Sequence, residues 1–281
     1  MTSPPSFTRH GPLVPSSPLV LAVPHAGRDY PQALQSAIRV PVAALKTLED
    51  RCADALALEA WRGETLFIAH RARAWIDLNR SEQDRDPKVE DGAGPAGAPL
   101  SDKLRSGLGL VPRRVGNSGD IWNRRLSSGE VASRIDEDHR PYHTALDHAL
   151  ETAHARYGIA ILVDIHSMPP LRSSGEPPRL VIGDRFGKAA AARFTGRIEE
   201  AARGLGVPVA INTPYAGAHT LERHGRPSGN IHGVQLEFDR SFYLDATLDR
   251  PGPGFAAAAR LLRAILDALL DEALPNAMAA E

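Results

Sequence analysis

Short apolar runs alternate with amphipathic stretches along most of the chain. Short apolar runs predict strands over residues 18–24, 65–70, 72–78, 159–165, 179–183, 208–212 and 233–238, and the continuous run over residues 18–24 is typical of a strand buried on both faces. Helical periodicity predicts helices over residues 48–61, 142–157, 188–205 and 255–270. Strands that alternate with helices predict an α/β protein with a layered sheet, built as a single domain over residues 1–281.

Three segments between these elements carry signals of their own. Thr47 is the predicted N-cap of the helix over residues 48–61, with Asp50 in the capping-box position. Residues 82–120 are rich in Gly, Pro and charge and poor in periodicity, so we expect a long surface excursion with one short helix. Residues 213–231 are rich in Gly, His and Arg, and we expect a loop there.

Composition excludes several classes of protein. The chain has 33 Lys and Arg against 34 Asp and Glu, a net charge of −1, which argues against a dedicated nucleic-acid binder. Its one cysteine, Cys52, excludes an internal disulfide and a multi-thiolate zinc site, and fits a small buried apolar residue better than a nucleophile. Because the sequence has neither an apolar run of ~20 residues nor a signal-peptide pattern, we expect a cytoplasmic protein without a membrane partner.

Polar side chains gather where predicted strands end, and in open α/β sheets ligands bind beyond the carboxyl ends of strands. His25 follows the first strand, where its ring either binds a metal or is satisfied by hydrogen bonds of a turn. Asp164 and His166 are two residues apart, so they share one face of their strand. The carboxylate would then orient the imidazole of a metal ligand, or the two form a buried structural pair.

Further polar residues complete this set. Glu237 interrupts an otherwise apolar strand, where it either acts as a general base or pairs with an arginine. Arg80 either binds a substrate carboxylate or pairs with Asp77, and Asp50 is either a metal ligand or a helix cap. Histidines, carboxylates and an arginine at separate strand ends indicate a mononuclear metal hydrolase. A serine hydrolase acting through Ser167 is less favoured, because no nucleophile elbow surrounds that residue.

At these clusters the sequence resembles the N-formylglutamate amidohydrolase (N-formylglutamate deformylase) family. The matching stretches follow the family order over about residues 18–246, and they are residues 23–31, 49–54, 76–80, 140–143, 163–167, 212–217 and 234–245. The resemblance implies a three-layer α/β/α domain with a mixed central sheet, similar to zinc carboxypeptidases. The chain departs from the family pattern at Asp239, where asparagine is common, and matches only loosely over residues 82–120 and 215–219.

The resemblance also implies roles for individual residues. His25 and His166 would be two metal ligands, and the third would be an acidic residue of the Glu49-Asp50 pair. Asp50 is preferred, because the Asp-Arg pair is what matches the family. The metal would be Zn²⁺, or another divalent transition metal such as Co²⁺, Mn²⁺ or Fe²⁺. Glu237 would be the catalytic carboxylate.

The substrate implied by the resemblance is a small acidic N-acyl amino acid. The expected reaction converts N-formyl-L-glutamate and water to L-glutamate and formate, hydrolysis of a linear amide that belongs to histidine degradation. Asn79 and Arg80 would stand at one substrate carboxylate, by likeness to the Asn-Arg pair of carboxypeptidases. Arg223 and Arg240 would serve the second carboxylate, or pair with the acidic residue beside each in the sequence.

Other functions stay open at this point. The same fold could act on another N-acyl amino acid or a short peptide. The chain could also be a non-catalytic binding module that retains the cleft, or a metal-independent serine or cysteine hydrolase. The sequence predicts no oligomeric state.

Overall fold

The computed structural model describes residues 5–93, 102–116, 119–172 and 175–274. The described residues form two compact units. Unit 1 falls within Met1–Thr8, Pro24–Asp50 and Ile68–Ala145, and unit 2 within Arg9–Val23, Arg51–Phe67 and Leu146–Glu281. Each unit is therefore assembled from segments that are far apart in the sequence. The single domain over residues 1–281 stays a prediction.

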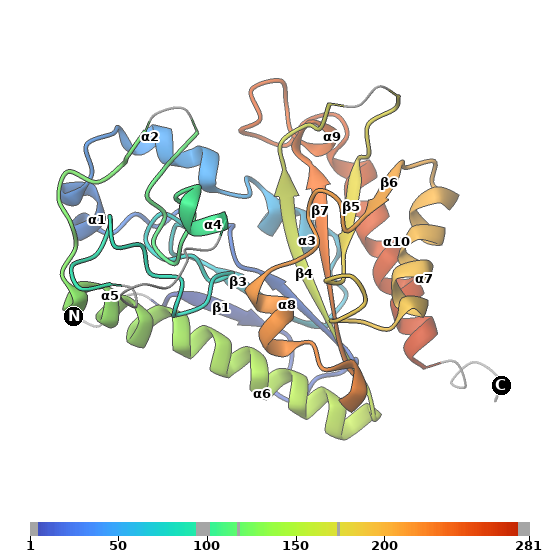
Figure 1. Cartoon of the computed structure of the whole chain (residues 1–281). Helices are drawn as coiled ribbons and strands as arrows, with labels where there is room; N and C mark the ends of the chain where they lie inside the picture. The colour runs from blue at the N-terminus through green and yellow to red at the C-terminus, as the bar shows by residue number, and fades with distance from the viewer. Residues whose placement is uncertain (1–4, 94–101, 117–118, 173–174, 275–281) are drawn as a thin grey trace. The chain divides into compact units, whose positions relative to one another are not determined.

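A seven-stranded sheet has the order β1-β3-β2-β4-β7-β5-β6 (Figure 1). Its strands are β1 (Phe7–His10), β2 (Leu19–Val23), β3 (Thr65–Ala69), β4 (Ala160–Met168), β5 (Leu180–Gly183), β6 (Val209–Ile211) and β7 (Ile231–Asp239). β2, β4 and β7 run parallel, and β5 runs antiparallel to β7. The sheet is therefore mixed, as the resemblance implies.

The parallel strands at the centre of the sheet bring their carboxyl ends to one edge. All residues of β2, β4 and β7 are buried; β2 is apolar throughout, whereas β4 and β7 also contain polar residues. Ala22 of β2 pairs with Asp164 of β4, and His166 of β4 pairs with Glu237 of β7. Polar residues in such strands need partners, so this edge is where a site is expected.

Helices cover both faces of the sheet within unit 2. α3 (Ala53–Ala60) and α10 (Phe255–Ala273) pack together and against β2, and α7 (Ala192–Gly204) packs on α10, β5 and β6. α8 (His219–His224) packs on β4 and β7 from the other face (Figure 1). Two short elements, η3 (Pro227–Gly229) and α9 (Arg240–Tyr243), flank β7. The α/β architecture is as predicted.

Unit 1 is built from short helices and turns. Its helices are α1 (Gln32–Ala37), α2 (Val42–Leu45), η1 (Lys46–Leu48), α4 (Asp102–Arg105), α5 (Ser128–Arg134), a π-helix (Ile135–His139) and the beginning of α6 (Arg140–Tyr157). The guanidinium of Arg134 lies 3.7 Å from the ring centre of Trp75 and 5.4 Å from that of Trp122. Burial lowers the pKa of Arg134 to about 10, so this residue packs in the core of unit 1 as a cation.

One helix begins later than predicted. α3 starts at Ala53 rather than near residue 48, and Cys52 before it has a left-handed backbone (φ 59°). Asp50 is not in a capping box, because its backbone N–H donates to the carbonyl of His25 at 2.9 Å instead. Because α3 begins after Asp50, a helix-capping role does not account for this carboxylate.

Two further predictions of secondary structure were wrong. Residues 72–78 form turns instead of a strand, with the N–H of Trp75 donating to Ala72 and that of Asp77 donating to Leu110. Residues 213–231 contain α8 and η3 instead of forming only a loop. The excursion over residues 82–120 has the expected short helix, α4, while residues 94–101 and 117–118 lie outside the described part.

The remaining elements agree with their predictions. Six predicted strands correspond to β2 to β7, and the helices predicted over residues 142–157, 188–205 and 255–270 correspond to α6, α7 and α10. β1 was not predicted. Among the described residues, no helix has the length and apolar character needed to cross a membrane.

Candidate active site

His25 lies in unit 1, two residues after the end of β2, and is almost fully buried. Its Nε2 is 2.7 Å from Oδ1 of Asp77, and its Nδ1 is 3.5 Å from Oδ2 of Asp50. Because a carboxylate only accepts hydrogen bonds, the close contact with Asp77 places the ring proton on Nε2. The Nδ1 lone pair is then directed toward the carboxylate of Asp50, an arrangement that suits a shared cation.

Asp77 is the anion around which this part of unit 1 is organised. It is fully buried, and it accepts hydrogen bonds from Nε of Arg73 and the backbone N–H of Asn79, each at 2.8 Å. Burial raises the pKa of Asp77, but the charge of Arg73, the contact with His25 and the charge of Arg80 outweigh burial and hold that pKa well below its usual value. Asp77 thus orients His25, a role that its position in the sequence did not reveal.

Arg80 ends the same turn and is also nearly buried. Its Nε donates to the carbonyl of Leu108 at 2.8 Å, and its Nη1 donates to the carbonyl of Asn79 at 2.7 Å. Nε is 3.9 Å from the Asp77 carboxylate, so the predicted pairing with Asp77 is present as a long contact. Burial lowers the pKa of Arg80, and Asp77 counteracts it. The guanidinium is therefore held in one orientation by backbone carbonyls.

Unit 2 contributes a second histidine and carboxylate. Asp164 and His166 lie on one face of β4, as their spacing predicts, with Oδ2 of Asp164 2.9 Å from Nε2 of His166. Asp164 is fully buried and His166 nearly so. If Nε2 of His166 carries the proton toward Asp164, its Nδ1 is the ring atom left for a metal.

Glu237 stands beside this pair on the neighbouring strand. Glu237 of β7 pairs with His166 of β4, and Gln235 pairs with Asp164. Side chains of paired residues in a parallel ladder project to the same face, so the four side chains share one face. The amide Nε2 of Gln235 donates to Oε1 of Glu237 at 2.9 Å, a neutral contact that fixes the carboxylate. Gln235 is a further polar residue that the sequence had not singled out.

Arg240 follows β7 directly. Its Nε donates to Oγ of Ser167 at 3.0 Å. Asp239, the acidic neighbour considered as its partner, instead binds Nη1 of Arg179 at 2.8 Å. The structure therefore places Arg240 at the carboxyl end of β4, beside the residue that follows His166.

Arg223 lies on α8, which begins and ends within the predicted loop. Its Nη2 is 3.5 Å from Oδ2 of Asp147, which also accepts from Nδ1 of His224 at 2.7 Å. Glu222, the acidic neighbour considered as its partner, binds Arg185 at 2.6 Å. Among the predicted site residues of unit 2, Arg223 thus belongs to a different contact network from that of His166 and Glu237.

The nine predicted site residues are divided between the units. Unit 1 brings together four of them, namely His25, Asp50, Asn79 and Arg80. Unit 2 holds the other five, namely Asp164, His166, Arg223, Glu237 and Arg240. Each unit supplies a buried histidine whose ring is oriented by a carboxylate, a pattern typical of histidines that bind metals.

A protein-family model described as N-formylglutamate amidohydrolase matches residues 17–244. The chain is 27% identical over 236 residues to an N-formylglutamate deformylase of Pseudomonas putida, covering 82% of this chain and 83% of the relative. It is 25% identical over 263 residues to an N-formylglutamate deformylase of Pseudomonas aeruginosa, covering 92% of each.

Solved structures show the same similarity. The crystal structure of N-formylglutamate amidohydrolase from Ralstonia eutropha JMP134 matches with a TM-score of 0.84 and 33% identity, over 94% of this chain and 97% of that one. A gene product of Agrobacterium tumefaciens matches with a TM-score of 0.67 and 19% identity, over 95% of both chains, and shares the fold.

Proposed function

Because the chain belongs to the N-formylglutamate amidohydrolase family, we propose that it hydrolyses N-formyl-L-glutamate to L-glutamate and formate. The observation that carries this proposal is the extent of the family match. Residues 17–244 contain all nine residues that we assign to the site, from His25 to Arg240. Relatives that carry the name N-formylglutamate deformylase support the same substrate.

His25, Asp50 and His166 are the proposed ligands of a divalent metal. Two ligand atoms on one tetrahedral ion, each at ~2.0–2.1 Å, lie about 3.3 Å apart. The 3.5 Å between Nδ1 of His25 and Oδ2 of Asp50 fits that spacing. Glu49 is the weaker candidate, because its carboxylate accepts a hydrogen bond from the hydroxyl of Tyr30. Two imidazoles and a carboxylate suit Zn²⁺ and also Co²⁺ or Mn²⁺.

The connectivity of the chain supports a single site. His25 follows Val23, the last residue of β2, by two residues, so it reaches at most about 7 Å beyond the strand. β2 lies parallel to β4 with Ala22 beside Asp164, two residues before His166. The two proposed histidine ligands therefore belong to neighbouring strands, His25 just beyond the end of β2 and His166 near the end of β4, and ligands of α/β proteins bind at such strand ends. A divalent metal held there supplies a Lewis acid for the formyl carbonyl and the attacking water.

Glu237 is the proposed general base and acid. The amide of Gln235 holds the carboxylate through Oε1, and one of the carboxylate oxygens takes a proton from the attacking water. The same oxygen then returns the proton to the amide nitrogen, so that the amino acid leaves as an amine. Asp164 keeps His166 in the tautomer that can bind a metal.

Arginines recognise the two carboxylates of the substrate in this proposal. Arg80 offers its remaining nitrogen, Nη2, to the carboxylate next to the scissile amide, with Asn79 beside it. Its buried, pre-oriented guanidinium costs little conformational entropy on binding. Arg240 and Arg223 are the candidates for the side-chain carboxylate.

A panel assay tests the function directly. Protein prepared without chelators is assayed with N-formyl-L-glutamate, N-acetyl-L-glutamate and N-formyl-L-leucine, with and without 1,10-phenanthroline, and its metals are measured. We expect about one transition metal per chain, preference for N-formyl-L-glutamate, and loss of turnover with the chelator. Preference for N-formyl-L-leucine would refute the dicarboxylate substrate, and undiminished activity of metal-free protein would refute the metal.

The role of Glu237 is tested with a matched pair of substitutions. Glu237→Gln is expected to lower kcat by about 10²–10⁴-fold while metal content stays the same. Glu200→Gln, at an exposed glutamate of α7, is the control and should retain the activity of the unmodified protein. Near-normal turnover by metal-loaded Glu237→Gln would show that another group moves the proton.

A further inference from the structure

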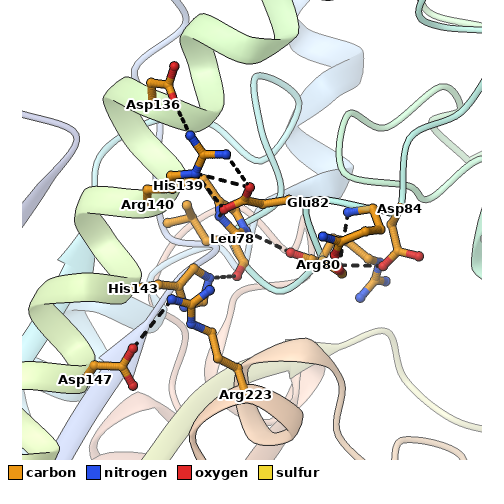
Figure 2. Close-up of polar contacts among 12 residues, drawn as sticks. Leu78, Arg80, Glu82, Asp84, Asp136, His139, Arg140, His143, Asp147 and Arg223 are labelled. Carbon is orange, nitrogen blue, oxygen red and sulfur yellow. Dashed lines mark hydrogen bonds and ion pairs between the residues drawn. The ribbon is translucent and has the colours of Figure 1, made fainter. Parts of the chain in front are cut away.

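Two buried histidines outside the proposed site lie against the turn that carries Arg80. His139 ends the π-helix and His143 lies one helical turn later on α6, and both are fully buried. Their ring centres are 4.4 Å apart. Figure 2 shows both side chains projecting from the helix toward Leu78 and Arg80.

Each ring donates one hydrogen bond to a backbone carbonyl of this turn. Nε2 of His139 is 2.8 Å from the carbonyl oxygen of Arg80, and Nε2 of His143 is 2.9 Å from that of Leu78. Because a carbonyl oxygen only accepts, both Nε2 atoms carry the proton. The two carbonyls flank Asn79, so the pair fixes the turn on both sides of that residue.

The π-helix fastens the same segment at a third point. Oδ2 of Asp138 accepts from the indole Nε1 of Trp75 at 2.6 Å. Asp138 and His139 are consecutive, yet both are buried against residues 75–80. A wide helical turn lets consecutive side chains serve one surface, and such π-turns recur at functional sites.

The position of the Asp77–Arg80 turn determines where the Arg80 guanidinium lies. Nη1 of Arg80 donates to the carbonyl of Asn79, which lies between the two carbonyls bound by the histidines. A shift of this turn would therefore move the backbone of Arg80 and one anchor of its guanidinium together. On the outer side of the pair, Glu82 lies 3.8 Å from Nδ1 of His139 and forms an ion pair with Arg140 at 2.8 Å.

We infer that His139 and His143 are positioning residues that hold the Asp77–Arg80 turn so that Arg80 meets the carboxylate next to the scissile amide. The inference rests on the proposed function of Arg80 and adds a specificity role for two residues that do not touch the substrate. Their paired N–H donors, rather than their volume alone, carry this role.

Substitutions that separate the donor from the volume test the inference. His139→Leu and His143→Leu fill the space without a donor, whereas His139→Gln and His143→Gln keep an N–H close to the position of Nε2. His148→Leu, an exposed histidine on the same α6, is the matched control. If a leucine variant does not fold, an asparagine at the same position replaces it, because its shorter amide cannot reach the carbonyl.

The first measurement is independent of catalysis. Hydrogen–deuterium exchange is followed on peptides covering residues 76–82. The leucine variants should exchange faster than the unmodified protein by about 10-fold or more, the scale of a lost buried hydrogen bond, and the glutamine variants should stay close to it. Exchange in the leucine variants equal to that in His148→Leu would overturn the inference.

The second measurement is a ratio of specificities. The kcat/KM for N-formyl-L-glutamate is divided by that for N-formyl-L-isoglutamine, in which a carboxamide replaces the carboxylate next to the scissile amide. Arg80→Lys should lower this ratio, and each leucine variant should lower it by about 10-fold with unchanged metal content. In an Arg80→Lys background, His143→Leu should cause no further decrease.

The two proposals fail in different ways. Unchanged ratios in the leucine variants, or no recovery in the glutamine variants, overturn the positioning role even when N-formyl-L-glutamate is the substrate. An unmodified protein that does not distinguish acid from amide refutes the role of Arg80 and, with it, the specificity role of the pair.

Discussion

The two histidines proposed as metal ligands are each oriented by a carboxylate, but one carboxylate is close to its histidine in the sequence and the other is distant. His166 contacts Asp164, two residues away on the same strand, at 2.9 Å. His25 contacts Asp77, which lies 52 residues away in a turn, at 2.7 Å. The first pair follows from the alternation of a strand, and the second exists only in the folded chain.

The surroundings of the two carboxylates also differ. Asp77 has Arg73 at 2.8 Å and Arg80 at 3.9 Å, so its negative charge is compensated without a metal. For Asp164, no hydrogen bond to either oxygen is formed by the described residues, and its close contact is the 2.9 Å approach of Oδ2 to Nε2 of His166. Two similar carboxylate–histidine pairs therefore contribute differently. Asp77 stabilises the fold as well as orienting His25, whereas Asp164 acts mainly on His166.

Asparagine substitutions at the two carboxylates would produce the largest effects. Asp77→Asn should weaken metal binding by about 10–100-fold and lower the free energy of unfolding by roughly 3–5 kcal/mol, because it leaves Arg73 and the buried Arg80 without their shared anion. Asp164→Asn should weaken metal binding similarly, with a loss of stability below about 2 kcal/mol. Competition with a chromophoric chelator and urea unfolding of metal-free protein measure the two quantities. Equal losses of stability would break the distinction.

His232 sharpens the comparison, because it is a buried histidine with neutral partners. Its Nδ1 accepts from the N–H of Ala191 at 3.3 Å, and its ring centre lies 4.6 Å from that of Phe194. Burial, and then the charge of Arg193, lower its pKa from 6.5 to about 4. Folding therefore favours the neutral ring, and this contribution is complete above pH 6.5 and is lost as the pH falls toward 4.

Protonation of His232 is expected to lower the free energy of unfolding by up to about 3 kcal/mol between pH 6.5 and pH 4. His232→Asn keeps an acceptor close to Nδ1 but does not titrate in this range. Urea unfolding between pH 4 and 7.5 should therefore show a flatter pH dependence for the variant. The same slope in both proteins would assign the acid sensitivity to other groups.

The smallest expected effect comes from a contact that is entirely local. Ser127 and Glu130 form a capping box at the start of α5, with the backbone N–H of Ser127 donating to Oε2 of Glu130 at 2.8 Å. The hydrogen bond with Arg124 is the largest cause that lowers the pKa of Glu130, to about 2. Because the contact is exposed, Ser127→Ala should cost only about 1 kcal/mol in thermal unfolding. A loss as large as that of Asp77→Asn would contradict the ranking of local and distant contacts.

The predicted strand over residues 72–78 shows what an apolar pattern can and cannot establish. Ala72, Ala74, Ile76 and Leu78 are all at most 3% exposed, so the alternation identified buried positions correctly. The backbone nevertheless forms turns, because its N–H groups find partners in Ala72 and in the distant Asp29 and Leu110. Patterns report burial, and tertiary hydrogen bonds decide the conformation. Where the apolar run was nearly continuous, as in β2 and β3, burial and strand conformation coincided.

Some features of the candidate site could likewise be predicted from sequence patterns, and others depend on tertiary contacts. The family and the amidohydrolase class were predicted from ordered motifs and are confirmed by the match over residues 17–244. The contact of Asp164 with His166 follows from two-residue spacing alone. The roles of Asp77, Gln235 and the histidine pair on α6 depend on which segments the fold brings together, so spacing could not reveal them. The true capping box at Ser127 has the usual Ser-x-x-Glu signature and could have been found.

The order of the strands in the sheet also determines how long after one another paired strands are synthesised. The central strand β4 lies between β2, whose Leu19 pairs with Ile161, and β7, whose His232 pairs with the same residue. At about 5–20 residues per second, a ribosome adds the partner of Leu19 roughly 7–30 s after Leu19 itself. Until then β2 has only its other neighbour, β3 (Thr65–Ala69), to pair with, and the edge of β2 that later binds β4 stays open. The proposed ligand His25 thus emerges early, well before His166 is synthesised.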